Sequence, residues 1–115
     1  MANNHSTLLV EGDPVELDDE GYLLDFNAWN RSVAEALARQ DALTLTPEHW
    51  EIIELLRLFY QEFQQAPAMR ALVKYVGLQL GADKGNSIHL LRLFPGSPAR
   101  RAARIAGLPR PEHCL

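Results

Sequence analysis

Apolar residues recur at two different periods along the chain, and the change of period divides it into two regions. Over residues 7–24, short apolar runs are interrupted at 12–14 and at 18–21 by residues that favour turns. This pattern predicts a small β-hairpin or meander. After residue 25 the period becomes about 3.6, which is typical of amphipathic helices.

Helices are predicted in the second region from apolar stripes and from the residues that flank them. The first has Trp29, Val33 and Leu37 at i, i+4 and i+8, with Asn27 as its N-cap and an end near Arg39. The segment 47–64 is apolar on more than one side, so we expect it to be the central helix of a small bundle. Three more helices are expected from Pro67 to Gly81, from Asn86 to Phe94, and from Ser97-Pro98 to Gly107.

The size and composition of the chain indicate one folded domain covering residues 1–115. It has 115 residues, of which 47% are hydrophobic and 23% charged, close to ordinary globular usage. No run approaches the roughly 18 apolar residues of a membrane span, and the N-terminus lacks the features of a signal peptide. We therefore expect a cytoplasmic protein.

Charge is distributed unevenly between the two halves of the chain. Residues 1–65 carry 13 acidic side chains and three arginines, whereas residues 66–115 carry eight basic and two acidic side chains. Such asymmetry points to binding of an anion, a nucleic acid or an acidic protein surface by the basic half. The alternative is that the two halves attract each other within the folded monomer.

The only cysteine, Cys114, is the residue most suggestive of chemistry. It is the penultimate residue, and two nearby prolines favour an extended segment over about 107–115, which we expect to be a mobile arm. Such an arm could carry the sulfur roughly 25 Å from the end of the last helix. Arg104 and Arg110 are nearest in sequence among the cations that could stabilise a thiolate. A lone cysteine forms no intramolecular disulfide, so a role for it involves a second molecule.

Other kinds of site have little support in the sequence. The four histidines and Cys114 show no spacing typical of metal ligands, and we expect no metal, no cofactor and no pocket for a small molecule. His49 is expected at the surface and His89 partly packed. A helix-turn-helix over 68–80 and 87–94 remains an alternative, in which the protein is a regulatory or nucleic-acid-binding module.

Several motifs together resemble the TusE/DsrC sulfur-carrier family, over about residues 8–115. They are Asp19-Glu20-Gly21-Tyr22-Leu23, Pro47-Glu48-His49-Trp50-Glu51, Pro67-Ala68-Met69-Arg70, Lys84-Gly85-Asn86-Ser87, Leu93-Phe94-Pro95, Gly96-Ser97-Pro98-Ala99, and Ile105 to Pro111 followed by the penultimate Cys114. The resemblance implies a small helical protein with an N-terminal β-hairpin and a reactive penultimate cysteine on a mobile arm.

The resemblance also implies a function and distinguishes two branches of the family. In the DsrC branch a second cysteine lies eleven positions before the penultimate one, and Ala103 occupies that position here. The TusE-like branch is therefore favoured, which implies a sulfurtransferase that holds sulfur as a persulfide on Cys114. Its implied partners are a TusBCD-like donor complex and an MnmA-like tRNA thiolase, with 2-thiouridine at the tRNA wobble position as the product; direct contact with tRNA is left open.

Overall fold

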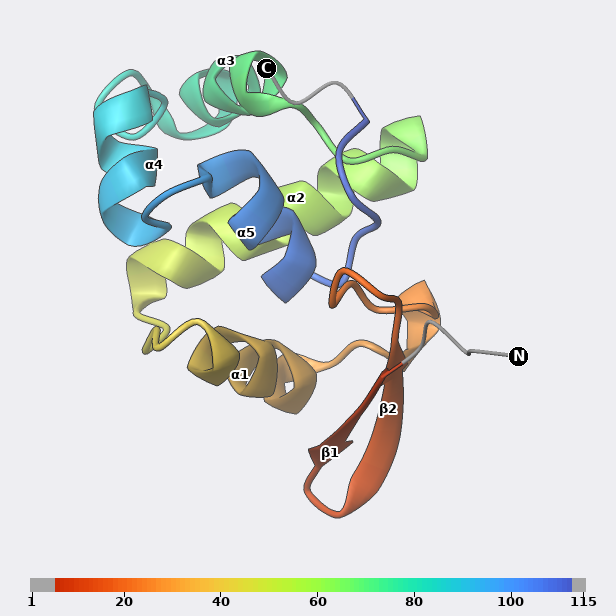
Figure 1. Ribbon diagram of the computed structural model, residues 1–115. Coiled ribbons are helices and arrows are strands. Elements are labelled where there is room, and N and C mark those ends of the chain that lie inside the picture. Colours follow the sequence, from red (N-terminus) through yellow and green to blue (C-terminus); the bar gives the residue numbers. More distant parts are fainter. Residues whose placement is uncertain (1–5, 113–115) are drawn as a thin grey trace.

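The computed structural model describes residues 6–112, in which a β-hairpin is followed by five α-helices (Figure 1). The predicted fold class, a mainly helical bundle with an N-terminal β-hairpin, is confirmed. None of these helices is long and apolar enough to cross a membrane. The elements are β1 (Ser6–Val10), β2 (Asp13–Leu17), α1 (Arg31–Gln40), α2 (Pro47–Phe63), α3 (Met69–Leu80), α4 (Ser87–Leu93) and α5 (Pro98–Ile105).

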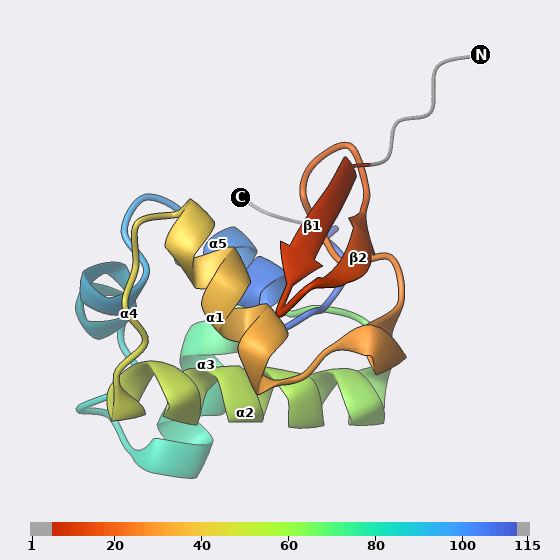
Figure 2. The same ribbon diagram turned by 90° about the horizontal axis from the view of Figure 1, so that it is seen from below.

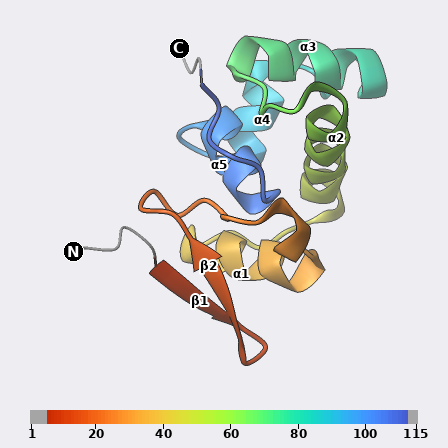
Figure 3. The same cartoon turned by 90° about the vertical axis from the view of Figure 1, so that its right-hand side faces the viewer.

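The hairpin is closed by a two-residue turn. Val10 pairs with Asp13 across it, and the two turn residues, Glu11 and Gly12, have φ values of 53° and 86°. A tight hairpin turn with positive φ at both positions matches the twist of the flanking strands. Figures 2 and 3 show the hairpin projecting beside α1, at the side of the molecule away from α4.

Helix α1 begins later than the sequence predicts. Its N-cap is Asn30, whose side chain accepts a hydrogen bond from the backbone N–H of Val33 at 2.9 Å. Asn27 instead belongs to a single 3-10 turn (Phe26–Ala28), so its prediction as the N-cap was wrong. The reason is local, because the carboxylate of Asp25 accepts from the N–H of Asn27 and starts that separate turn. Trp29 consequently lies in extended backbone between the two helices.

The N-terminus of α2 is fixed to the end of α4 by a buried histidine. His49 Nε2 lies 2.7 Å from the carbonyl oxygen of Leu93, and its Nδ1 accepts from the N–H of Thr46 at 3.0 Å. The prediction that His49 is a surface residue was therefore wrong, since only 7% of it is exposed. His89 on α4 is also buried, more completely than the partial packing we predicted.

The central position predicted for α2 belongs to α5. This short helix contacts α1, α2, α3 and α4, and it lies between α1 and α3 in Figures 1 and 3. Its three alanines, Ala99, Ala102 and Ala103, are all buried. Alanine allows neighbouring helices to approach from several sides, because its side chain extends so little from the backbone. Helix α5 therefore forms the centre of the bundle despite its length.

Candidate functional site

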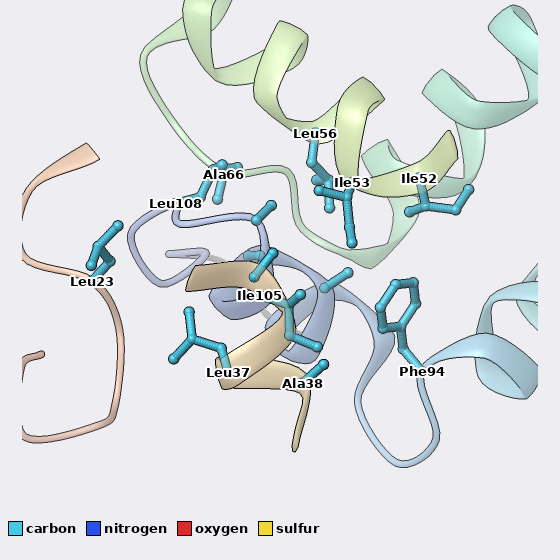
Figure 4. Close-up of a cluster of buried hydrophobic side chains, with 14 of the residues drawn as sticks. Leu23, Leu37, Ala38, Ile52, Ile53, Leu56, Ala66, Phe94, Ile105 and Leu108 are labelled. Carbon is cyan, nitrogen blue, oxygen red and sulfur yellow. The ribbon is translucent and has the colours of Figure 1, made fainter. Parts of the chain in front are cut away.

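The last described residues, 107–112, lead toward Cys114 and lie against the helical body. Cys114 itself is outside the described residues, as are its two neighbours. Leu108 and Pro111 are fully buried, and Leu108 belongs to the buried cluster drawn in Figure 4. Any motion of the predicted arm that begins at Gly107 would therefore have to break these contacts.

Trp29 holds the end of α5 where this segment begins. Its indole Nε1 donates a hydrogen bond to the carbonyl oxygen of Ile105 at 2.9 Å. The same side chain packs on Gly107, which has a φ of 77° and no room for a Cβ atom. The indole thus satisfies a carbonyl that the last turn of a helix leaves without a partner, and it fixes the direction in which the chain leaves α5.

Arg57 of α2 contacts both the Trp29 side chain and the C-terminal end of α5. Its guanidinium carbon lies 3.9 Å from the ring centroid of Phe26 and 4.0 Å from that of Trp29. One guanidinium nitrogen donates to the carbonyl oxygen of Ala106 at 2.8 Å. Burial lowers the pKa of Arg57 from its ordinary value, yet the group stays charged at neutral pH. A cation at the C-terminus of α5 is favoured by the helix dipole.

Arg104, one of the two predicted thiolate-stabilising cations, is occupied by contacts between α5 and α1. It forms an ion pair with Asp41 at 2.9 Å and donates to the side chain of Gln40 at 2.9 Å. It also donates to the carbonyl oxygens of Leu37 at 3.1 Å and Gly21 at 3.4 Å. Its side chain is 12% exposed. Through these contacts Arg104 links α5 to the C-terminal end of α1 and to the loop that contains Gly21.

Arg110, the other predicted cation, lies in the segment that leads to Cys114. Its guanidinium forms an ion pair with Glu20 at 2.8 Å, and both side chains are about half exposed, at 47% and 48%. Ion pairs this exposed contribute little, on the order of 0–1 kcal/mol. This ion pair with Glu20 therefore contributes less to stability than the largely buried ion pair between Arg104 and Asp41.

Sequence reasoning missed Trp29 and Arg57 as a pair that anchors the arm. Trp29 was assigned to a helical stripe, and Arg57 was counted only as a charge. One signal was present: Arg57 follows Ile53 by four residues and precedes Tyr60 by three, so a charged residue interrupts an apolar stripe of α2. An arginine on such a stripe needs a partner in the fold.

The described surface contains hollows but no cluster suited to a metal ion. One of about 470 Å³ lies beside α2 and is lined by Trp29, Trp50 and Leu58, among others. A second, of about 290 Å³, lies at the start of α5. Within residues 6–112 no three histidine, aspartate, glutamate or cysteine side chains lie close enough to hold a metal. The expectation that the protein has no pocket for a small molecule stays a prediction.

The helix-turn-helix alternative rests on α3 and α4. Helix α4 directs His89, Leu90 and Leu93 into the core, and its exposed residues include Ile88 and Leu91. Polar side chains that could read base edges are therefore few on this helix.

Comparison with known proteins gives a consistent match over almost the whole chain. The family model described as "DsrC like protein" matches residues 9–115. Sulfurtransferase TusE of Escherichia coli K12 is 45% identical over 94% of this chain and 99% of its own length. A sulfurtransferase TusE homolog of Haemophilus influenzae is 49% identical with the same coverage.

Solved structures of similar proteins have the same fold. The NMR structure of Allochromatium vinosum DsrC superposes with a TM-score of 0.88 at 50% identity, covering 96% of this chain and 99% of that one. The crystal structure of the oxidized γ-subunit of dissimilatory sulfite reductase (DsrC) from Archaeoglobus fulgidus gives a TM-score of 0.83 at 40% identity, covering 96% of this chain and all of that one.

Proposed function

The chain belongs to the family of DsrC-like proteins, and from this premise we propose that it carries sulfur as a persulfide on Cys114 for 2-thiolation of the tRNA wobble uridine. A role in sulfur relay follows from the family and from the relatives named sulfurtransferase TusE. The proposal adds the carrier residue, the chemical form of the sulfur and its destination.

The observation that carries the choice of branch is the single cysteine. Identity alone does not separate the branches, because the chain is 45% identical to TusE of E. coli K12 and 50% identical to DsrC of A. vinosum. Ala103, where the DsrC branch is expected to have its second cysteine, is fully buried in the centre of α5. With no second thiol in the chain, an internal disulfide or trisulfide cannot form, which supports a TusE-like carrier.

The proposed transfer is a balanced exchange of sulfur between thiolates. The thiolate of Cys114 attacks the outer sulfur of a donor persulfide, so that the S–S bond of the donor breaks and the donor leaves as a thiolate. Cys114 then holds the persulfide. An acceptor thiolate attacks the outer sulfur in turn, and Cys114 is released as a thiolate, ready for another cycle.

The described contacts limit how far the arm reaches while they are intact. Cys114 lies two residues beyond Glu112, so its Cα can lie at most about 7 Å from that of Glu112. The reach of roughly 25 Å predicted from the end of α5 requires residues 107–111 to detach. Detachment would expose Leu108, at a cost of about 1.5–3 kcal/mol. We therefore propose that transfer uses short excursions beyond Pro111 and brings the partner close to the body.

Of the two candidate cations, Arg110 is better placed to act on the sulfur anion. It lies four residues before Cys114, and its ion pair with Glu20 is solvent-exposed and readily exchanged. Arg104 would have to leave Asp41 and three further acceptors. The proposal assigns Arg110 to stabilise the thiolate or persulfide anion.

The proposal also includes partners and a location. A TusBCD-like complex would supply the sulfur and an MnmA-like tRNA thiolase would receive it, in the cytoplasm. The alternative of a regulatory or nucleic-acid-binding module makes a different prediction, namely DNA binding with a steep dependence on salt concentration.

A sulfur-loading assay tests the proposal directly. The full chain is incubated with a cysteine desulfurase, L-cysteine and a TusBCD-type donor complex, and its intact mass is measured. We expect a gain of about 32 Da, one sulfur atom, located on Cys114. The variant Cys114→Ser should not be loaded, whereas Glu112→Gln, a matched change two residues away, should be loaded normally. Equal loading of the serine variant would refute the assignment.

A further inference from the structure

A groove at the start of α5 lies between α3, α4 and α5, all of which belong to the basic half of the chain. It has a volume of about 290 Å³ and is lined by Met69 of α3, Leu91 of α4, and Pro98, Ala99 and Arg100 of α5, with Gly96 and Ser97. Most of these lining groups are apolar. The space is large enough for one or two apolar side chains, and too small for a folded element of a partner.

Helix α4 leaves two large apolar side chains exposed beside this groove. Ile88 is 76% exposed and Leu91 is 44% exposed. They are three residues apart, so they lie on the same face of the helix, and Leu91 is itself a wall of the groove. Exposed apolar groups that adjoin a groove are typical of surfaces that bind another protein.

Two arginines border the same apolar surface without acidic partners. Arg100 lines the groove, and Arg92 follows Ile88 by four residues on α4. Neither forms an ion pair with a described residue, whereas Arg101 and Arg104 both form ion pairs with Asp41. The stretch 66–104, which supplies this whole surface, contains a single acidic residue. The positive charges of Arg92 and Arg100 are therefore available to an acidic partner.

The groove continues toward the base of the arm. Ser97 and Arg100 also line a neighbouring hollow of about 190 Å³, which includes Glu20 and Tyr22. Glu20 forms the ion pair with Arg110, and the hydroxyl of Tyr22 donates to the carbonyl oxygen of Arg100 at 3.5 Å. A protein that binds in the groove would thus lie next to the segment that leads to Cys114.

We propose that this groove, together with Ile88, Leu91, Arg92 and Arg100, is the docking surface for an acidic face of the sulfur-donor protein. One apolar side chain of that partner fills the groove, and its carboxylates pair with the two arginines. The inference rests on the proposed sulfur-carrier function and names where on the body the partner binds.

Two other occupants fit the observations less well. A nucleic acid would pair its phosphates with the arginines, but it would gain little from burying Ile88 and Leu91. A second copy in a two-fold symmetric dimer would bring the same patch together from both chains and gather their arginines in one interface without acidic partners from the patch. An acidic protein surface satisfies both the apolar and the charged part of the patch.

Transfer kinetics with charge-reversal variants test the proposal. We compare Arg100→Glu with Arg39→Glu, a matched change of charge at an exposed arginine of α1. The rate of sulfur uptake from a TusBCD-type donor complex is measured against carrier concentration. For Arg100→Glu we expect KM to rise at least tenfold with kcat within twofold, and for Arg39→Glu we expect both to stay near wild type. Leu91→Ser should also raise KM, and the size of this increase should not depend on the salt concentration.

The outcomes separate the docking surface from the function itself. Normal KM for Arg100→Glu and Leu91→Ser, with sulfur uptake intact, would overturn the docking surface and leave the carrier function standing. In another outcome, the wild type binds the donor complex without taking up sulfur, and binding is weakened in both variants. That result would refute the function while supporting the docking surface. A wild type that neither takes up sulfur from the donor complex nor binds it would overturn both. If the protein binds tRNA, and Arg100→Glu weakens this binding while Leu91→Ser does not, the patch binds a nucleic acid. If the protein self-associates and Leu91→Ser abolishes this, the patch binds a second copy. Either result would overturn the proposal.

Discussion

The indole of Trp29 packs so closely on Gly107 that a Cβ atom at position 107 would lie 2.5 Å from the indole Cδ1. Residues 78 positions apart in the chain thus meet where the C-terminal segment leaves α5. With the hydrogen bond from Trp29 to Ile105 and the guanidinium of Arg57 above the ring, this contact sets the starting point of the arm. The direction in which the described C-terminal segment leaves α5 is therefore fixed by these contacts.

Replacing Gly107 with alanine should destabilise the protein more than its backbone conformation alone explains. Gly12 is the matched control, since its φ of 86° is similar but nothing lies within 4 Å of a Cβ built there. Gly12→Ala should cost about 1–2 kcal/mol from left-handed strain, and Gly107→Ala about 1–3 kcal/mol more from the clash. Urea denaturation measures both. Introducing Trp29→Ala should remove most of the additional loss, and equal losses for the two glycine variants would contradict the close contact.

Arg57→Met should lower the free energy of unfolding by about 2–3 kcal/mol. The variant keeps the apolar first part of the side chain but loses the charged hydrogen bond to Ala106 and the contacts of the guanidinium with the faces of Phe26 and Trp29. Arg39→Met, at an exposed position, should change stability by less than about 0.5 kcal/mol. Hydrogen exchange should also show faster exchange at the Leu108 amide, which bonds to Ala103. Unchanged exchange there would contradict an anchoring role.

Gly77 and Gly85 should respond to alanine in opposite directions. Gly77 lies inside α3, where a Cβ would make ordinary contacts of 3.8 Å with Gly85, so Gly77→Ala should stabilise by about 0.5–1 kcal/mol through helix propensity. A Cβ on Gly85 would lie 2.2 Å from the Cα of Gly77, where backbone meets backbone. Gly85→Ala should therefore cost about 3 kcal/mol or more. Thermal unfolding distinguishes the two, and a stable Gly85→Ala protein would contradict the predicted approach.

The stabilising effect of Lys84 should disappear at high pH. Its ammonium lies 2.6 Å from the carboxylate of Glu51, and this hydrogen bond, with the nearby negative charge, raises the pKa of Lys84 above its ordinary value. A raised folded-state pKa stabilises fully below the ordinary lysine pKa of about 10.4, and the effect is lost as the pH rises through the folded value. The difference in Tm between wild type and Lys84→Gln should be constant from about pH 6 to 9 and shrink above pH 10.

Added salt and a second lysine provide the control for this prediction. Lys74→Gln, at an exposed lysine of α3 with no ion pair to a described residue, should show no such pH dependence. Raising the ionic strength should reduce the effect of Lys84, because its ion pair is partly exposed. A difference in Tm that shows no decrease at all as the pH rises above about 10 would mean that the lysine acts through packing of its alkyl chain.

Most of the secondary structure followed from the sequence, because its signals are local. The cap-and-proline start at Thr46-Pro47, the glycine after α3 and the cap at Asn86 each depend on neighbours within four residues. The start of α1 was misplaced because two cap residues, Asp25 and Asn30, stand five positions apart and both are used. The single cysteine, the uneven charge and the family resemblance also came from the sequence alone.

Only the tertiary structure decided which residues anchor the arm and which helix is central. Trp29, Arg57 and Gly107 come from three separate segments, and nothing in their local sequence records that they meet. The same applies to His49, which reaches a carbonyl of α4 and so is buried against expectation. Local patterns report the conformation of the chain, whereas contacts between distant residues depend on how the elements pack, because packing is set by the shapes of several elements at once.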